Sequence, residues 1–522
     1  MIQTQDVTLA EMAEEDLVKY LDKKVEDTFG ELPIYMLLPF KENSEIDIIL
    51  NRYVDEINVV AFKFISLLND IPNPTINQIQ VIAIDELIRI SKKHVWGICF
   101  TSDKIYVFNG RYWISISEEK MIQFLTKSII KMGINNLNAR QPKFQKAVFD
   151  QFKASANLDK PVRSAHEIKI NLKNGTFVVK NGIGELIPFE REDFLTYQLP
   201  FDYNPEAEAP LFLKYLNEVI PEEEKQLVLA EFMGYIFIRN GLLKLEKILV
   251  LYGSGANGKS VFFEIINSLL GSDNISNHSL EALTKREYDR AGIVDKLVNY
   301  SSEISNKIQI DMFKRLASGE TITGRHPYGR VFHIENYCRF IFNSNELPKD
   351  TEISDAFFRR FIIIHFANTI PEEQQDKKLA NKIIDNELSG VFNWMMTGLS
   401  RLIKNQNFTE SVLISNEVKN YRKNSDTVEL FLEEESWQPS YDKTIKLSDL
   451  YIQYKSFCKD NEMPPIGNKK LIEALHKRGI HSKKGNEGRV VFISKNLFEI
   501  ESLSSLSSPS EIESDESDES VA

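Results

Sequence analysis

Eight consecutive residues of this chain have the types and spacing that hold a phosphate chain. The segment G-S-G-A-N-G-K-S at 253–260, called here the phosphate loop, fits the pattern G-x-x-x-x-G-K-[ST] at every fixed position. Its glycines let backbone N–H groups curl around phosphate oxygens, Lys259 would reach the β- and γ-phosphates, and the Ser260 hydroxyl would ligate Mg²⁺. A chance glycine turn is the alternative, but the fixed positions coincide by accident only about 0.01 times in such a chain. The pattern therefore predicts binding of ATP with Mg²⁺. The residues expected to contact the nucleotide are Gly253, Ser254, Gly255, Ala256, Asn257, Gly258, Lys259, Ser260 and Val261.

A carboxylate downstream is the candidate for activating the attacking water. An enzyme with such a loop needs an acid near Mg²⁺, at the tip of a strand beside the loop strand. The strand-like run that begins at Lys296 ends in Glu303, so Glu303 is predicted to be the catalytic base and a neighbour of the metal. The alternative is an ordinary strand-end carboxylate. Two successive acids are the more usual form, and Ser302 occupies the first place here.

Three further polar residues could complete a hydrolytic site. Asn345 follows an apolar strand and could hydrogen-bond the γ-phosphate or the water, although Asn is also common at strand ends. Arg359 and Arg360 stand between apolar runs and suit an arginine finger offered to the nucleotide of a neighbouring subunit. A surface ion pair is the alternative for either arginine. The finger role would require an oligomer with sites at subunit boundaries.

Basic and aromatic residues gather between two strand-like runs at 319–333. Tyr328 and Arg330 lie at the expected tip, with Arg325 and His326 beside them. A hairpin tip of this composition suits a single DNA strand, through phosphate contacts and base stacking.

The elements that must position these residues follow from the hydrophobic pattern. Ile248–Tyr252 is an apolar run of strand length, and the residues after the loop carry apolar positions at helical spacing until Gly271. This strand, loop and helix predict an α/β core. Asn109–Gly110 and Asn174–Gly175 predict hairpins upstream. The expected domains are a mostly helical region at 1–95, an α+β domain at 96–244, the nucleotide domain at 245–400, a helical connector at 401–430, a basic domain at 431–500 and a disordered acidic, Ser-rich tail at 501–522.

Composition narrows the class of protein. The chain has 522 residues and three scattered cysteines, a usage that disfavours a zinc module and suggests a reducing compartment. There is no run of 18 apolar residues and no apolar signal core at the start, so no membrane span is expected. We expect a cytoplasmic protein, in a bacterial host or its equivalent.

The charge is unevenly distributed, although the net value is −13. Residues 501–522 carry seven acids and no Lys or Arg, whereas residues 443–495 carry twelve Lys or Arg against five Asp or Glu. A basic amphipathic helix at 468–478, followed by a basic-tipped hairpin, indicates a winged helix whose helix enters a major groove. A solvated basic face is the alternative. The candidate DNA contacts are Lys469, Lys470, Lys477, Arg478, Lys483, Lys484 and Arg489.

This ordered set of motifs resembles the superfamily 3 helicases, in the branch of the phage and plasmid primase-helicases and the poxvirus primase-helicase. The motifs that carry the resemblance are G-S-G-A-N-G-K-S (253–260), 299–303, 314–330, F-N-S-N-E-L-P (342–348) and A-F-F-R-R-F (356–361). Upstream, Y-V-F-N-G-R-Y-W (106–113), N-G-T-F (174–177) and L-A-E-F-M-G-Y (229–235) resemble the domain that precedes the ATPase in this branch. Downstream, L-S-D-L-Y-I-Q-Y (447–454) and the basic stretch after it resemble its winged helix. The resemblance covers residues 95–500.

The resemblance implies an AAA+-type core in a hexameric ring that moves 3′→5′ on single-stranded DNA. It implies that Lys259 and Ser260 bind the triphosphate and Mg²⁺, that Glu303 activates water and that Asn345 is a polar sensor. Arg359 or Arg360 would be the finger, and the tip at 325–330 would lie in the pore. Ser302 departs from the commoner acid, which leaves the metal shell of this chain open.

Many such relatives carry a primase-polymerase domain before the core. That domain needs about 150–200 residues and clustered acids, and only residues 1–95 lie outside the resemblance. Asp47 and Asp85 there are not paired with other acids in a convincing strand context. No primase activity is expected, so a separate primase or polymerase would be a partner.

Three functions compete at this point. The leading one is an ATP-driven replicative helicase of a phage, plasmid or other mobile element, acting on single-stranded and forked DNA. The second is an initiator that binds and melts an origin without processive unwinding. The third is a protein-remodelling ATPase, which the basic C-terminal domain and the Arg/Tyr hairpin disfavour.

Overall fold

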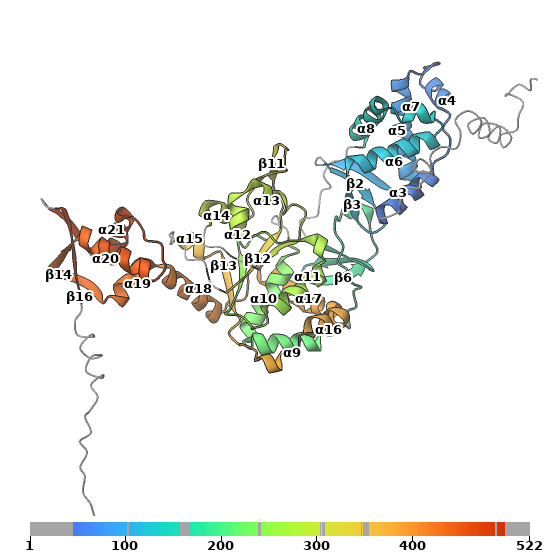
Figure 1. The fold of residues 1–522 in the computed structure, drawn as a ribbon. Coiled ribbons are helices and arrows are strands. Elements are labelled where there is room, and N and C mark those ends of the chain that lie inside the picture. Colours follow the sequence, from blue (N-terminus) through green and yellow to red (C-terminus); the bar gives the residue numbers. More distant parts are fainter. Residues whose placement is uncertain are drawn as a thin grey trace, which may run out of the picture. The chain divides into compact units, whose positions relative to one another are not determined.

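The chain divides into two compact units, Met1–Pro161 and Val162–Ala522. A computed structural model (Figure 1) describes residues 45–94, 96–101, 104–156, 167–238, 242–302, 304, 308–345, 347, 354–485 and 488–495. The predicted tail at 501–522 lies outside these ranges. The unit boundary falls inside the α+β domain that was predicted at 96–244.

The first unit combines helices with a three-stranded antiparallel sheet. Its elements are α3 (Glu45–Asp55), α4 (Phe62–Leu67), α5 (Ile76–Lys93), β1 (Gly97–Thr101), β2 (Lys104–Phe108), β3 (Trp113–Ile116), α6 (Glu118–Lys131), α7 (Asn136–Ala139) and α8 (Pro142–Ser155). The hairpin predicted at Asn109–Gly110 is confirmed, because β2 and β3 pair antiparallel around it. Leu50, Leu87 and Val107 belong to one core. The predicted boundary at residue 95 therefore runs through a single core, because the helices before it bury their apolar faces against this sheet.

A parallel sheet of five strands forms the centre of the second unit, in the order β13–β7–β12–β9–β8. Its strands are β7 (Ile248–Tyr252), β8 (Ile275–Ser276), β9 (Val298–Ser301), β12 (Arg339–Ser344) and β13 (Phe361–His365). The helices of this region are α9 (Pro210–Val219), α10 (Glu223–Tyr235), α11 (Lys259–Leu270), α12 (Leu280–Lys285), α13 (Glu287–Ala291), α14 (Ile310–Ser318), α15 (Asp355–Phe358), α16 (Leu379–Asn386), α17 (Leu388–Asn405) and α18 (Val412–Ser425). The predicted α/β core, with its strand, loop and helix at 248–270, is confirmed.

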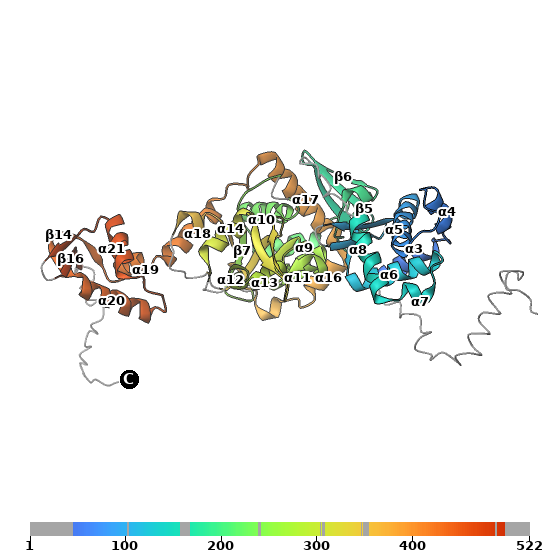
Figure 2. The same cartoon turned by 90° about the horizontal axis from the view of Figure 1, so that it is seen from above.

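Both faces of this sheet are covered. Alternate side chains of a strand point to opposite faces. Leu249 and Leu251 accordingly belong to one apolar core, and Ile248 and Val250 belong to another. Helices lie on either side of the sheet (Figures 1 and 2). Burial on two faces explains why β7 is an uninterrupted apolar run.

Two segments pack onto this core against expectation. The antiparallel sheet of β4 (Glu167–Leu172), β5 (Gly175–Lys180) and β6 (Ile183–Ile187) contains the predicted Asn174–Gly175 hairpin and shares the core of Leu249. In α18, the Tyr421 ring lies 5.1 Å from that of Phe358 and 5.7 Å from that of Phe361. Residues 412–425 therefore cover the sheet instead of forming the connector predicted at 401–430.

The C-terminal residues form a small domain with its own core. Its elements are α19 (Thr427–Glu434), β14 (Trp437–Lys446), α20 (Leu447–Asp460), α21 (Asn468–Lys477), β15 (Ser482–Gly485) and β16 (Gly488–Lys495), with the sheet order β14–β16–β15. Phe431, Leu450, Leu471 and Val491 are buried together. The predicted order of basic helix and hairpin is present. None of the helices in the described ranges is long and apolar enough to cross a membrane.

Candidate nucleotide and nucleic-acid sites

The phosphate loop between β7 and α11 is a concave run of backbone amides. Gly255, Ala256 and Gly258 have φ values of 115°, 48° and 87°, and left-handed residues in such a run form a nest of N–H groups that attracts anions. The backbone N–H groups of residues 254–258, all of them described, donate to no acceptor in the described protein. A Cβ on Gly258 would lie 2.7 Å from Cγ1 of Val219, so only glycine fits there. This cradle fits a phosphate group.

Residues distant in sequence hold the loop in this shape. The Tyr215 hydroxyl of α9 donates to the Gly258 carbonyl at 2.8 Å. The Asn257 side-chain amide donates to the Phe366 carbonyl at 3.1 Å, and the Ile370 N–H donates to the Ala256 carbonyl at 2.8 Å. Sequence reasoning missed Tyr215 and the segment after β13, because neither carries a local motif.

Lys259 is buried at the start of α11. Its Nζ donates to the Gly253 carbonyl at 2.6 Å and to Oδ1 of Asn257 at 2.9 Å. Burial lowers the pKa of the Lys259 ammonium from its ordinary value, and an adjacent phosphate would favour the charged form again. The Ser260 side chain is exposed beside it. A buried cation, an exposed hydroxyl and unpaired amides together fit a triphosphate with Mg²⁺.

The candidate acid was predicted on a strand beside the loop strand, and this prediction is wrong. β12 lies between them: Ile341 pairs with Leu249 of β7 on one side and with Tyr300 of β9 on the other. Ser302 is exposed at the end of β9, and Glu303 lies outside the described residues. The sheet order thus places the end of β12 directly next to the phosphate loop, where the Gly253 N–H donates to the Ser344 carbonyl at 3.1 Å.

Asn345 is exposed at that end of β12, the strand next to the phosphate loop. Two positions earlier, the buried Asn343 accepts a hydrogen bond from the Tyr300 hydroxyl at 3.1 Å. This bond ties β12 to β9, the strand of the candidate acid. Asn343 and Asn345 share one side of the strand because side chains alternate. The repeated Asn was a signal for this second amide that the sequence reasoning did not use.

Arg359 and Arg360 lie at the opposite edge of the sheet from the phosphate loop. They precede Phe361, which pairs with Ile248 at the start of β7, whereas the loop follows the far end of that strand. A five-residue strand spans about 16 Å, so neither arginine serves the loop of its own chain. The Arg360 side chain is 8% exposed and donates to Ser318 Oγ and Glu246 Oε2, at 2.9 and 3.4 Å. The Arg359 side chain is 65% exposed.

The basic-aromatic segment forms a hairpin of β10 (Ile322–Arg325) and β11 (Val331–Ile334) that projects beyond α13 and α14 (Figure 1). Tyr328 at its tip is fully exposed, and Arg330 is exposed beside it. Arg325 Nε donates to the Gly329 carbonyl at 3.0 Å, and the His326 ring stacks on Phe332 at 5.1 Å. Arg325 and His326 therefore brace the tip, and both are exposed to solvent like Tyr328 and Arg330.

The C-terminal domain presents most of its predicted basic contacts. Leu471 and Leu475 bury one face of α21, and the exposed basic side chains are Lys469, Lys470 and Lys477 on this helix and Lys483 and Lys484 on β15. Arg489 opposes Lys484 and donates to Ser482 Oγ at 2.9 Å. Arg478 was predicted to contact DNA, but its side chain has partners within the protein. It pairs with Asp426 and Glu429 inside the domain, and these acids neutralise its charge.

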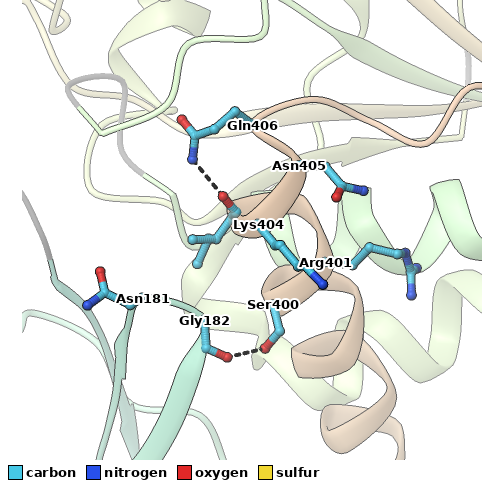
Figure 3. Close-up of a pocket in the computed structure, with 8 residues that line it drawn as sticks. Asn181, Gly182, Ser400, Arg401, Lys404, Asn405 and Gln406 are labelled. Carbon is cyan, nitrogen blue, oxygen red and sulfur yellow. Dashed lines mark hydrogen bonds between the residues drawn. The ribbon is translucent and has the colours of Figure 1, made fainter.

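A cavity in the second unit is lined by other residues. It measures about 730 Å³ and lies between the β5–β6 turn and the end of α17 (Figure 3). The Ser400 hydroxyl donates to the Gly182 carbonyl at 2.6 Å, and Arg401 pairs with the buried Glu231 at 2.6 Å. None of its lining residues belongs to the phosphate loop, the β10–β11 hairpin or α15. Its polar groups serve to join β5–β6 to the helices.

Comparison with protein families gives two matches. Residues 87–221 match the family described as D5 N terminal like, and residues 251–360 match a family of unknown function, DUF5906. The second match contains the phosphate loop, the hairpin and both arginines. The first runs from α5 to beyond α9, across the boundary of the two units.

Two individual proteins are similar to parts of this chain. A protein of Acanthamoeba polyphaga mimivirus whose name describes it as a candidate helicase is 24% identical over 272 residues, which is 47% of this chain. The chain spans 28% of that relative's length. An apo structure of the NrS-1 C-terminal region is 15% identical, with a TM-score of 0.46 over 78% of this chain and 98% of that one. The family and sequence matches relate the chain to replication proteins of the primase-helicase kind.

Proposed function

We propose that this chain is an ATP-driven replicative DNA helicase of superfamily 3, with an AAA+-type core, from a phage, plasmid or other mobile element. It would act as a hexameric ring that moves 3′→5′ on single-stranded DNA. The observation that carries the proposal is the geometry of the central sheet, with a phosphate loop at one end of its strands and an exposed arginine at the other. The separate Arg/Tyr hairpin that projects beyond α13 and α14 supports it. An arginine that cannot reach its own chain's nucleotide can serve only a neighbour's.

The residues divide the work of phosphoryl transfer. The amides of residues 254–258 and Lys259 would bind the triphosphate, and Ser260 would hold Mg²⁺, which bridges phosphate oxygens and offsets their charge. Glu303 would orient the attacking water, and Asn345 would contact the γ-phosphate or that water. Arg359 of the adjacent subunit would stabilise the charge that spreads over the transferred group. Arg360 would not serve as the finger, because its guanidinium is already held inside its own subunit.

DNA would contact two surfaces. Tyr328 and Arg330 suit a single strand in the ring, by stacking and by phosphate contact. The exposed lysines of α21 and β15 suit a duplex, because the order of elements in the C-terminal domain is that expected of a winged helix. A separate primase or polymerase would be the partner that extends the exposed strand.

A strand-displacement assay tests the proposal. The full chain is incubated with Mg²⁺, ATP and one of three substrates: a 3′-tailed fork, a 5′-tailed fork or a blunt duplex. The control is Lys259→Ala, which lacks the side chain proposed to bind the triphosphate. We expect displacement of the 3′-tailed fork only, and none by Lys259→Ala. ATPase stimulated by DNA without displacement of any fork would favour the initiator, whose origin contact would be the C-terminal domain. ATPase that is indifferent to DNA would favour a protein-remodelling enzyme.

A further inference from the structure

We propose that helix α13 couples β9, the strand before the candidate acid, to the β10–β11 hairpin. Asp289 and Arg290 are the positioning residues of this helix. The inference rests on the proposed function, because it links the site of hydrolysis to the surface for DNA. Two neighbouring residues of one short helix face different partners, one on the sheet side and one on the hairpin side. Figure 1 shows α13 at the base of the hairpin.

The first contact joins α13 to the central sheet through His278. Asn299 of β9 is buried, and its side-chain amide makes two hydrogen bonds with the backbone of His278. Oδ1 accepts from the His278 N–H and Nδ2 donates to the His278 carbonyl, both at 2.9 Å. His278 Nδ1 in turn lies 3.2 Å from Oδ1 of Asp289. The ring also lies against Gly292, where a Cβ would be 2.4 Å from its Nε2. His278 therefore contacts the middle of α13 and the glycine that follows this helix, so a movement of β9 would be transmitted to α13.

The second contact joins α13 to the hairpin through Arg290, which is buried. Its Nε donates to the Thr323 carbonyl of β10 at 2.7 Å, and one terminal nitrogen donates to the Leu283 carbonyl at 3.1 Å. Glu287, one turn earlier, accepts a hydrogen bond from the Thr323 hydroxyl at 3.2 Å. The planar guanidinium fixes the angle between helix and strand because its donors form a rigid fork.

The hairpin packs closely against α13, so it cannot move independently of this helix. A Cβ on Gly324, the next residue of β10, would lie 3.3 Å from the Ala291 backbone nitrogen. β10 and α13 must therefore move together. Tyr328 follows Gly324 by only a few residues, so it moves with them. Packed elements of this kind shift between discrete arrangements instead of deforming continuously.

The test uses His278→Ala, Asp289→Ala and the double variant, with Glu281→Ala as the matched control. Glu281 pairs with Lys285 at 2.6 Å, and this ion pair lies within α12. The measurements are basal ATPase, its stimulation by single-stranded DNA, and amide hydrogen exchange at 322–334 with and without a non-hydrolysable ATP analogue. We expect basal ATPase within about twofold of wild type and stimulation reduced about 3- to 30-fold. The double variant should be no worse than either single one, because both remove the same contact.

The outcomes separate this inference from the proposed function. If both single variants behave like Glu281→Ala, the coupling is overturned and the helicase assignment stands. If the wild-type chain hydrolyses no ATP, but the analogue changes exchange in its hairpin and the variants abolish that change, the activity fails and the coupling stands. A wild-type hairpin that does not respond to the analogue overturns the coupling. Arg290→Lys, which keeps the charge without the fork, should reproduce the loss of stimulation, and unchanged stimulation in that variant would also contradict the coupling.

Discussion

Arg359 and Arg360 are adjacent in sequence but have opposite surroundings. Arg360 is held by Ser318 and Glu246, whereas the Arg359 side chain extends to solvent from the end of α15 and lies 3.8 Å from one acid, Glu246. The exposed residue is therefore the one available to a neighbouring subunit. The buried residue stabilises the junction of α14, α15 and β7.

We expect Arg359→Ala to lower the ATPase kcat about 1000-fold, because it removes a charge that stabilises the transferred phosphoryl group, without lowering the melting temperature. Mixing it with Lys259→Ala should restore part of the activity, since the Lys259→Ala subunit offers an intact Arg359 to the other's intact phosphate loop. Arg360→Ala, the control, should instead lower the free energy of unfolding by about 2–4 kcal/mol, because it removes the buried guanidinium that donates to Ser318 and Glu246. Failure of the mixture to recover activity would contradict a finger shared between subunits.

Tyr328 is the other residue whose exposure calls for a partner. We expect Tyr328→Ala to weaken binding of a labelled oligo-dT by about 1–3 kcal/mol, the contribution of stacking one base on an aromatic ring. Tyr328→Phe keeps the ring and should bind within about twofold of wild type. Fluorescence anisotropy at one fixed salt concentration measures both. Equal binding by the two variants would remove the hairpin tip from the DNA surface.

At the scale of elements, α10 and α17 pack so closely that glycine is required at their contact. A Cβ on Gly398 would lie 2.3 Å from the carbonyl carbon of Ala230, and one on Gly234 would lie 2.6 Å from Cβ of Leu399. The buried Glu231 adds a polar tie, because Arg401 Nε donates to it at 2.6 Å. These two helices therefore form one rigid layer beneath the phosphate-loop sheet.

We expect Gly398→Ala to lower the free energy of unfolding by about 1–3 kcal/mol or more, because the added methyl group meets backbone atoms that cannot rotate away. Thr397→Ala, at the exposed neighbouring position, should change it by less than about 0.5 kcal/mol. Urea unfolding followed by circular dichroism gives both values. If the two variants are equally stable, the helices can separate at this contact and the layer is not rigid.

At the scale of the whole molecule, each of the three cysteines reports on a different part of the chain. Cys99 lies in the sheet of the first unit, Cys338 in a core beside the central sheet and Cys458 in the core of the C-terminal domain, and all three are buried. Burial raises the pKa of the Cys99 and Cys338 thiols to about 12 and also raises that of Cys458. Native thiols should therefore be unreactive.

We expect no reaction with a thiol reagent at pH 8 in native protein and three reactive thiols in denaturant. Mass spectrometry across a urea titration should find that labelling begins at different urea concentrations for the three cysteines, because their cores are separate. Since unfolded thiols ionise at a lower pH than native ones, the free energy of unfolding should fall as pH rises above about 8.5. A single common midpoint would show that the parts unfold as one cooperative body.

Local sequence determined the parts of this protein that depend on residues a few positions apart. The phosphate loop with its strand and helix, the Asn109–Gly110 and Asn174–Gly175 hairpins and the basic helix of the C-terminal domain all follow from turn chemistry and periodicity. The order of these elements was enough to indicate a nucleotide-binding α/β core. The same reasoning placed domain boundaries badly at residue 95 and at 401–430, because a shared core leaves no mark in the composition of the segments that build it.

Only the tertiary structure decided which of these elements meet. It put β12 between β7 and β9, turned Arg360 inward and Arg359 outward, and paired Arg478 with Asp426 and Glu429. Each of these facts depends on residues separated by tens to more than a hundred positions, whose proximity is set by the packing of whole elements. The types of residues needed for phosphate and DNA chemistry are therefore written in the sequence. Which of two equivalent residues is free to perform that chemistry is set by packing, because burial and pairing belong to the fold.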